Sequence, residues 1–167
     1  PGWGIPVDEF WHSLFRWAHV LSGVMWIGIL WYFNFVQIEV MPGIPDEMKP
    51  AVGKHIAPEA LFWFRWGAMS TLITGLILAV FNSYLLDALM LKNLLGYGMW
   101  FGMIMWFNVW FIIWPAQKVA LGIVDAPAEA KPAAAAKAKM FSRINTLLSI
   151  PMLYAMVSMQ AGFRITF

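Results

Sequence analysis

Long apolar stretches alternate with short polar ones along this chain. Four apolar segments stand out, at about residues 10–36, 60–81, 94–114 and 141–163. None shows the two-residue alternation of a barrel strand, and each reaches the roughly 20 residues that a helix needs to cross a bilayer. Since only helices or closed barrels satisfy the backbone in hydrocarbon, the pattern predicts an all-α, integral membrane four-helix bundle. The chain, residues 1–167, then forms a single domain.

The links between these segments are short and well marked. Prolines punctuate the first link around residues 41–50, and residues 82–93 form the second. The third link, about residues 126–138, is a low-complexity loop of alanine, proline and lysine. Short links make sequential helices antiparallel neighbours.

The distribution of basic residues predicts the orientation of the bundle. One side carries Lys49, Lys54, Arg65, Lys118, Lys131, Lys137, Lys139 and Arg143, and the other carries Arg16, Lys92 and Arg164. Because Lys and Arg are retained on the cytoplasmic side, the first and third links are expected there. Both termini are therefore expected to be periplasmic.

Composition supports a membrane protein and narrows its chemistry. The chain is 61% hydrophobic and 12% charged, whereas soluble domains carry about 25% charged residues. The absence of cysteine excludes disulfides, thiolate metal sites, iron–sulfur ligation and covalent c-type haem attachment. No removable signal peptide is expected, because the first apolar run lacks a basic flank and a cleavage site. The net charge of +2 gives no reason to expect a nucleic-acid partner.

The first apolar segment carries ionisable residues at helical spacing. His12, Arg16, His19 and Gly23 follow one another in steps of three and four, which places them on one face. Imidazole is an axial ligand of haem iron, arginine pairs with carboxylates such as propionates, and Gly23 would let a flat macrocycle approach. This face therefore predicts a b-type haem with His19 as the iron ligand. The alternative is that His12 lies at the interface and His19 bonds a neighbouring helix.

A second axial ligand is not obvious from the sequence. His55 is expected at the cytoplasmic end and His19 in the periplasmic half, so the rise of a helix keeps them apart. The remaining choices are His12, a partner subunit, no second ligand, or a methionine from the third or fourth segment: Met99, Met103, Met156 or Met159.

Polar residues also gather in the expected cytoplasmic half. All four segments contribute at one depth: Asn34, Gln37, His55, Glu59, Arg65, Asn108, Gln117, Arg143 and Asn145. Intramembrane polar groups pair with each other or line a cavity. The set predicts either interhelical hydrogen bonds or a pocket for an anionic or quinone-like ligand. In both cases Arg65 and Arg143 are expected to point inward, toward Asn108 and Asn145.

Four stretches of the chain resemble a known family. They are RWAHVLSGVMWIGILWYFNFVQ (16–37), FWFRWGAMSTLITGL (62–76), FNVWFIIWPAQK (107–118) and RINTLLSIPML (143–153). Together they resemble the membrane N-terminal region of bacterial urate oxidase (urate hydroxylase). A looser pattern, mapping onto His19, Trp26 and Gly28, resembles haem-binding membrane protoporphyrinogen oxidases and copper-resistance D-like proteins. Unlike the urate enzyme, this chain has no CxxCH cytochrome motif and about half the helices.

The resemblance implies a redox setting in a bacterial inner membrane. The first functional hypothesis is a haem b electron-transfer subunit of an oxidoreductase system, with a cytochrome c or a quinone as redox partner. The second is a non-catalytic accessory subunit packed on a larger respiratory, photosynthetic or oxygenase complex. Both place the chain in lipid, against other membrane subunits or in a homo-oligomer, and neither assigns it a catalytic residue.

The predicted orientation is testable with a fusion. A reporter attached after Phe167 should be active as a periplasmic protein, because the basic links hold the opposite end in the cytoplasm. Alkaline phosphatase activity in intact cells measures this. Activity of a cytoplasm-specific reporter at the same position would overturn the orientation.

Overall fold

Four continuous helical runs dominate the computed structural model, which describes residues 7–160 and has no strand within that range. The runs are α1 (Val7–Trp31) with η1 (Tyr32–Gln37), α2 (Ile38–Val40) and η2 (Met41–Gly43); α3 (Lys49–Ala51) with η3 (Val52–Ile56) and α4 (Ala57–Phe81); α6 (Leu94–Phe107) with η4 (Asn108–Ile113) and α7 (Trp114–Ala120); and α8 (Ala130–Gln160). All four are long and apolar enough to cross a membrane. The all-helical prediction and the four candidate spans are thus confirmed.

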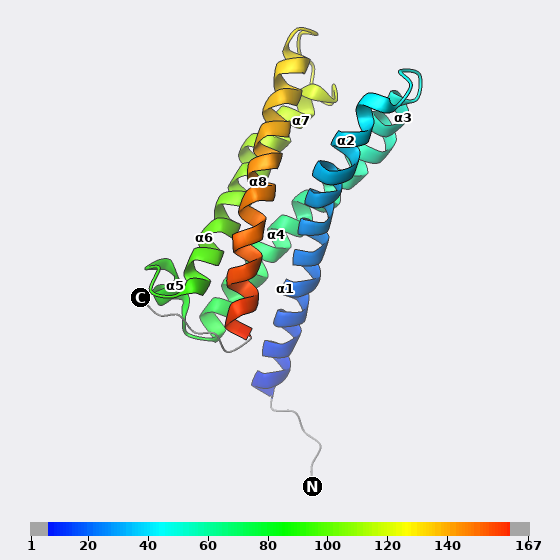
Figure 1. Ribbon diagram of the computed structural model, residues 1–167. Helices are drawn as coiled ribbons and strands as arrows, with labels where there is room; N and C mark the ends of the chain where they lie inside the picture. The colour runs from blue at the N-terminus through cyan, green and yellow to red at the C-terminus, as the bar shows by residue number, and fades with distance from the viewer. Residues whose placement is uncertain (1–6, 161–167) are drawn as a thin grey trace.

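The runs pair into two antiparallel hairpins. The first run packs along the second, chiefly through α1 and α4, and we call this pair the first hairpin. The third and fourth runs, α6 to α8, form the second hairpin. Figure 1 shows the hairpins diverging toward the end where α2, α3 and α7 lie. The short helix α5 (Leu85–Leu89) lies at the opposite end, in the link between the hairpins.

Small residues allow close packing within each hairpin. A Cβ on Gly67 would lie 3.2 Å from the backbone nitrogen of Trp26, and one on Gly98 would lie 2.9 Å from the Cβ of Ala155. Glycine at these points lets the helix backbones approach, as is usual between membrane helices. The side chains of Trp26, Phe64 and Met105 fill the buried interior beside these contacts.

Buried polar side chains link the helices at mid-depth. The Asn108 Nδ2 donates to Asn145 Oδ1 at 2.8 Å, and Asn145 Nδ2 donates to the Met105 carbonyl at 3.0 Å, which ties α8 to the third run. Two further bonds join the hairpins: Trp31 Nε1 to Ser149 Oγ at 3.0 Å and Asn34 Nδ2 to Ser142 Oγ at 2.8 Å. These contacts fix the depth at which one hairpin meets the other.

The helices extend beyond the apolar segments predicted from sequence. At the basic end of the bundle, the first and third runs continue to Gly43 and Ala120, and the second and fourth begin at Lys49 and Ala130. The predicted end of the last segment, residue 163, lies outside the described residues. Hydropathy marks only the part of a helix that faces hydrocarbon. Most of the expected loop at 126–138 is helical, because alanine and lysine are strong helix formers and the Pro132 ring is tolerated in a first turn.

Candidate functional site

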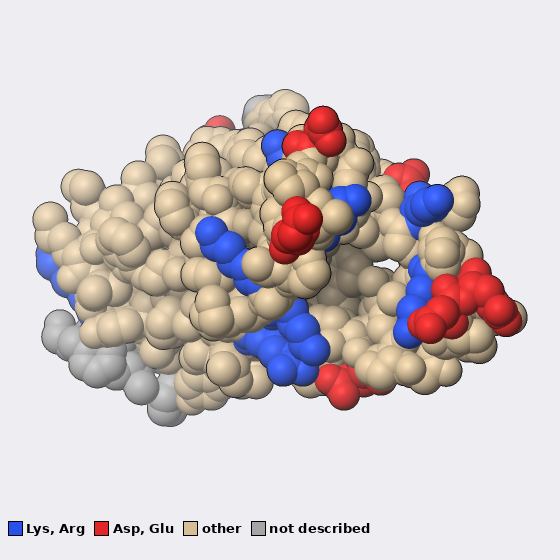
Figure 2. Space-filling view, turned by 90° about the horizontal axis from the view of Figure 1, so that it is seen from above, with Lys and Arg blue, Asp and Glu red and all other residues tan. Residues whose placement is uncertain are grey.

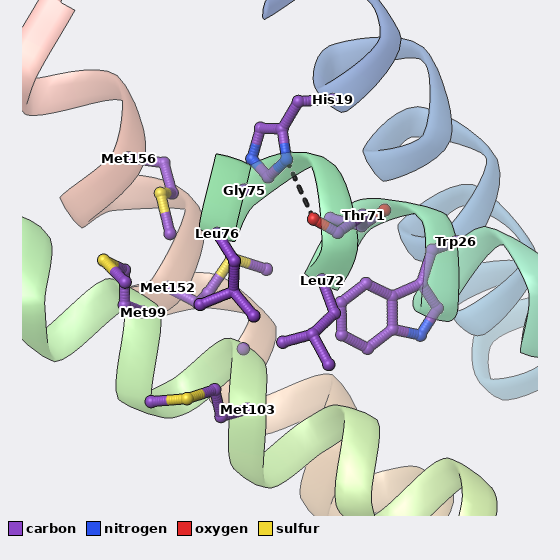
Figure 3. A pocket seen from close by; sticks show the side chains of 11 residues that line it. His19, Trp26, Thr71, Leu72, Gly75, Leu76, Met99, Met103, Met152 and Met156 are labelled. Carbon is purple, nitrogen blue, oxygen red and sulfur yellow. Dashed lines mark hydrogen bonds between the residues drawn. The ribbon is translucent and has the colours of Figure 1, made fainter. Parts of the chain in front are cut away.

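His19 is held in one orientation by the neighbouring helix α4. Its Nδ1 lies 3.0 Å from the Thr71 carbonyl oxygen and 3.2 Å from Thr74 Oγ1 (Figure 3). A carbonyl oxygen can only accept, so Nδ1 carries the proton and donates. The other ring nitrogen, Nε2, then has a free lone pair. This is the arrangement that metal-binding histidines use, with one nitrogen bonded to protein and the other available to the metal.

Three adjoining cavities meet at the His19 ring. An inner cavity of about 60 Å³ lies between the hairpins, an outer one of about 460 Å³ lies toward α5, and a lateral one of about 510 Å³ opens between α1 and α8. His19 lines all three. The two larger volumes fall within the roughly 300–1,000 Å³ of small-molecule and cofactor sites.

Methionines face His19 from the second hairpin. Met99 and Met103 of α6 and Met152 and Met156 of α8 line the inner cavity (Figure 3). Met99 and Met156 also line the outer cavity. Three of the four methionines predicted from sequence as second ligands therefore share a cavity with His19, while Met159 lies outside the described side chains. Met152 also lines the inner cavity, although it was not among the methionines predicted from the sequence.

Gly75 forms the wall of the site beneath the imidazole. A Cβ built at this position would lie 2.9 Å from His19 Cε1 and 3.3 Å from Nδ1. Any larger residue would displace the ring from Thr71. This contact with His19 is known only from the structure.

The outer cavity has several polar lining residues. Arg16 and Tyr84 line it together with His19 and Asn82. Burial raises the pKa of the Tyr84 phenol above its ordinary value, and the nearby Arg16 charge opposes that shift. Within the described residues Arg16 has no carboxylate at ion-pair distance, so its charge is available to an anionic group.

Of the other residues of the predicted haem face, Arg16 and Gly23 border cavities at His19, and His12 lies apart from them. His12 Nε2 donates to Asn82 Oδ1 at 2.8 Å, a bond at the outer end of the first hairpin, and His12 lines none of the three cavities. Gly23 lines the lateral cavity, where a Cβ would meet Thr71 Cγ2 at an ordinary 3.9 Å. Arg16 and Gly23 of the predicted face thus each share a cavity with His19, whereas the ring of His12 is bonded to Asn82.

The predicted polar pocket divides into separate contacts. Asn108 and Asn145 are hydrogen-bonded to each other. The prediction that Arg65 and Arg143 point inward toward them is wrong. Arg65 stacks over Trp114, with Cζ 3.4 Å from the ring centroid, and its Nε donates to the Leu61 carbonyl at 3.1 Å. The exposed side chain of Arg143 pairs with Glu39 at 3.4 Å. A cation–π face and a surface carboxylate satisfy these guanidinium groups without burying their charge among the asparagines.

Gln37 and Gln117, two further members of the set, line a different cavity near the basic end of the bundle. No group of three His, Cys, Asp or Glu side chains suited to a metal ion occurs within residues 7–160. The side chains lining the inner cavity with His19 include the sulfur atoms of four methionines, which can bind a metal.

Comparison with protein families agrees with the resemblance seen in the sequence. Residues 92–166 match the family described as urate oxidase N-terminal. The matched segment includes α6, α7 and α8 and so supplies the methionine side of the cavities, whereas His19 lies outside it. Neither the curated proteins nor the solved structures include a match to the chain.

Two glycines that line the inner cavity, Gly75 and Gly102, provide a matched test of the close contact between Gly75 and His19. Gly102→Ala should be neutral or stabilising by up to about 1 kcal/mol, because a Cβ there meets nothing within 4 Å. Gly75→Ala should be less stable than Gly102→Ala by at least about 1 kcal/mol, because it displaces the imidazole from its hydrogen bond. Unfolding in mixed micelles measures both. Equal stabilities would contradict the close approach of Gly75 to His19.

Proposed function

We propose that this protein is a b-haem-binding electron-transfer subunit of a bacterial membrane oxidoreductase system. The observation that carries the proposal is the His19 imidazole. Its Nδ1 is bonded to the Thr71 carbonyl, and its free Nε2 belongs to a ring that borders three cavities. A part-buried imidazole with one nitrogen fixed and the other free is preorganised for iron.

The residues around His19 fit a haem in composition and in space. The outer and lateral cavities each exceed 400 Å³, at about 460 and 510 Å³. Thioether sulfur, as in Met99 and Met156, is a known sixth ligand beside histidine in cytochromes. Arg16 lines the outer cavity near the membrane surface, where propionate carboxylates need a cationic partner. A haem bound there would supply one-electron redox chemistry.

The chain's own groups would orient the cofactor and exclude water. Thr71 fixes the His19 tautomer, and Gly75 keeps the ring in place from below. Leu72, Leu76 and Trp26 make the inner cavity apolar, which keeps water from the centre. Arg16 binds and positions anionic substituents at the outer end. None of these groups needs to gain or lose a proton in this role.

The setting of the protein supports the same proposal. The name of the family that matches residues 92–166 refers to an oxidase, which suits a redox partner for the bundle. We place the chain as a multi-pass protein of the bacterial inner membrane, with the first and third links cytoplasmic and both termini periplasmic. Most of the basic residues named for this orientation belong to α3, η3, α7 and the start of α8, at the end viewed in Figure 2.

Visible absorption of the gently purified protein tests the haem proposal. The wild type, expressed with added haem precursor, should show a Soret band at about one haem per chain. His19→Ala should remove the band, because the iron ligand is lost. His12→Ala is the matched control and should keep it, since His12 is bonded to Asn82 away from the cavities. Arg16→Ala should weaken haem retention without abolishing it.

Two results would contradict electron transfer. One is a folded wild type with no Soret band, even after reconstitution with haemin. The other is a band that survives in His19→Ala. Either result would favour the accessory-subunit function, in which the bundle contributes only its packing surfaces to a larger complex.

A further inference from the structure

A second cavity lies between the hairpins near the opposite, basic end. It has a volume of about 250 Å³ and takes lining residues from all four helical runs. Its walls include Phe33, Phe64 and Ile113 as apolar groups, with the amides of Gln37 and Gln117 among them. Figure 2 looks onto this end and shows a hollow bordered by Lys and Arg side chains.

Polar groups in this cavity have unused hydrogen-bonding capacity. Gln37 Oε1 is fully buried and has no partner among the described residues. The side-chain amide of Gln117 makes no hydrogen bond within that part of the chain, and Lys139, which also lines the cavity, has no carboxylate at ion-pair distance there. A buried acceptor without a partner costs about 1–3 kcal/mol, so a ligand that donates to Gln37 is favoured.

Irregular helix turns gather at the same place. The π-helical turns η1, η3 and η4 occur on three of the four runs, and each contributes lining residues: Phe33 and Gln37, Val52 and Gly53, and Ile113. π-Helical turns occur often at functional sites, because they re-aim side chains at the cost of regular hydrogen bonding. The turns η3 and η4 contain neither glutamine, so their presence here is a second observation that points to the same cavity.

We propose that this cavity binds the headgroup of a membrane quinone. A flat ring suits the apolar walls, and its two oxygens suit the polar groups. A quinone oxygen accepts from the Gln117 amide or the Lys139 ammonium, and a quinol hydroxyl donates to Gln37 Oε1. The volume of about 250 Å³ suits a single substituted ring, with its isoprenoid tail extending into lipid.

Two other ligand classes fit less well. A lipid acyl chain would leave Gln37 Oε1 without a donor. A soluble anion would find Lys139 as the one cationic side chain among the described lining residues, since Arg65 and Arg143 are engaged by Trp114 and Glu39. The quinone site is separate from His19, so it does not depend on haem binding.

Binding of a decyl-tailed benzoquinone to the full chain in lipid nanodiscs tests the proposal, with empty nanodiscs as the measure of partition into lipid. The wild type should bind saturably at about one quinone per chain. Gln37→Leu and Gln117→Leu should each weaken binding at least tenfold. Lys137→Met is the control, because Lys137 is exposed on the same helix as Lys139 and does not line the cavity.

A cavity-filling variant covers the case in which the glutamine variants misfold. Ala135 lines the cavity and is exposed, so Ala135→Trp should block the site while leaving the fold intact. His19→Ala should bind quinone like the wild type, which separates this proposal from haem binding. Uptake equal to that of empty nanodiscs, unchanged binding in folded Gln37→Leu, Gln117→Leu and Ala135→Trp variants, or loss of binding in His19→Ala would overturn it.

Discussion

Two side-chain hydrogen bonds hold the hairpins together at mid-depth: Trp31 to Ser149 and Asn34 to Ser142. Apolar packing alone distinguishes poorly between depths in a membrane, because lipid tails are as apolar as leucine. Each such bond contributes about 0.6 kcal/mol on average, which is small, but its geometry admits only one register. With the contact fixed there, cavities remain on either side of it, one group at His19 and one at Gln37.

The same need to satisfy polar groups explains the difference between the two ends. At His19, α4 offers the Thr71 carbonyl, so one ring nitrogen is satisfied within the protein and the other is left toward a cavity. At the basic end, Ser142 Oγ accepts from Asn34, while Gln37 Oε1 has no donor among the described residues. Both sites therefore combine a fixed polar group with a free one, and in hydrocarbon a free polar group favours a ligand.

Hydrophobic patterning was sufficient to predict the helices and their antiparallel order. The position of His19 within an apolar segment was sufficient to select it as a candidate ligand. Neither was sufficient for contacts that depend on rotation about a helix axis. Arg65 and Arg143 lie at the depth that the sequence indicates, but the face of each helix directs them to Trp114 and Glu39. Thr71 and Gly75 carry no chemical signal of their own, because their role comes from a backbone carbonyl and a missing Cβ. The π-helical turns likewise have no periodic signature.

The tautomer of His19 is the most direct test of the central claim, that α4 prepares this imidazole for a ligand. The chain has three histidines, so ¹⁵N-histidine NMR of the haem-free protein in bilayers is tractable, with His19 assigned by its loss in His19→Ala. The account predicts a neutral ring protonated at Nδ1 and unprotonated at Nε2. A ring protonated at Nε2 would have no lone pair facing the cavities and would contradict the proposed site.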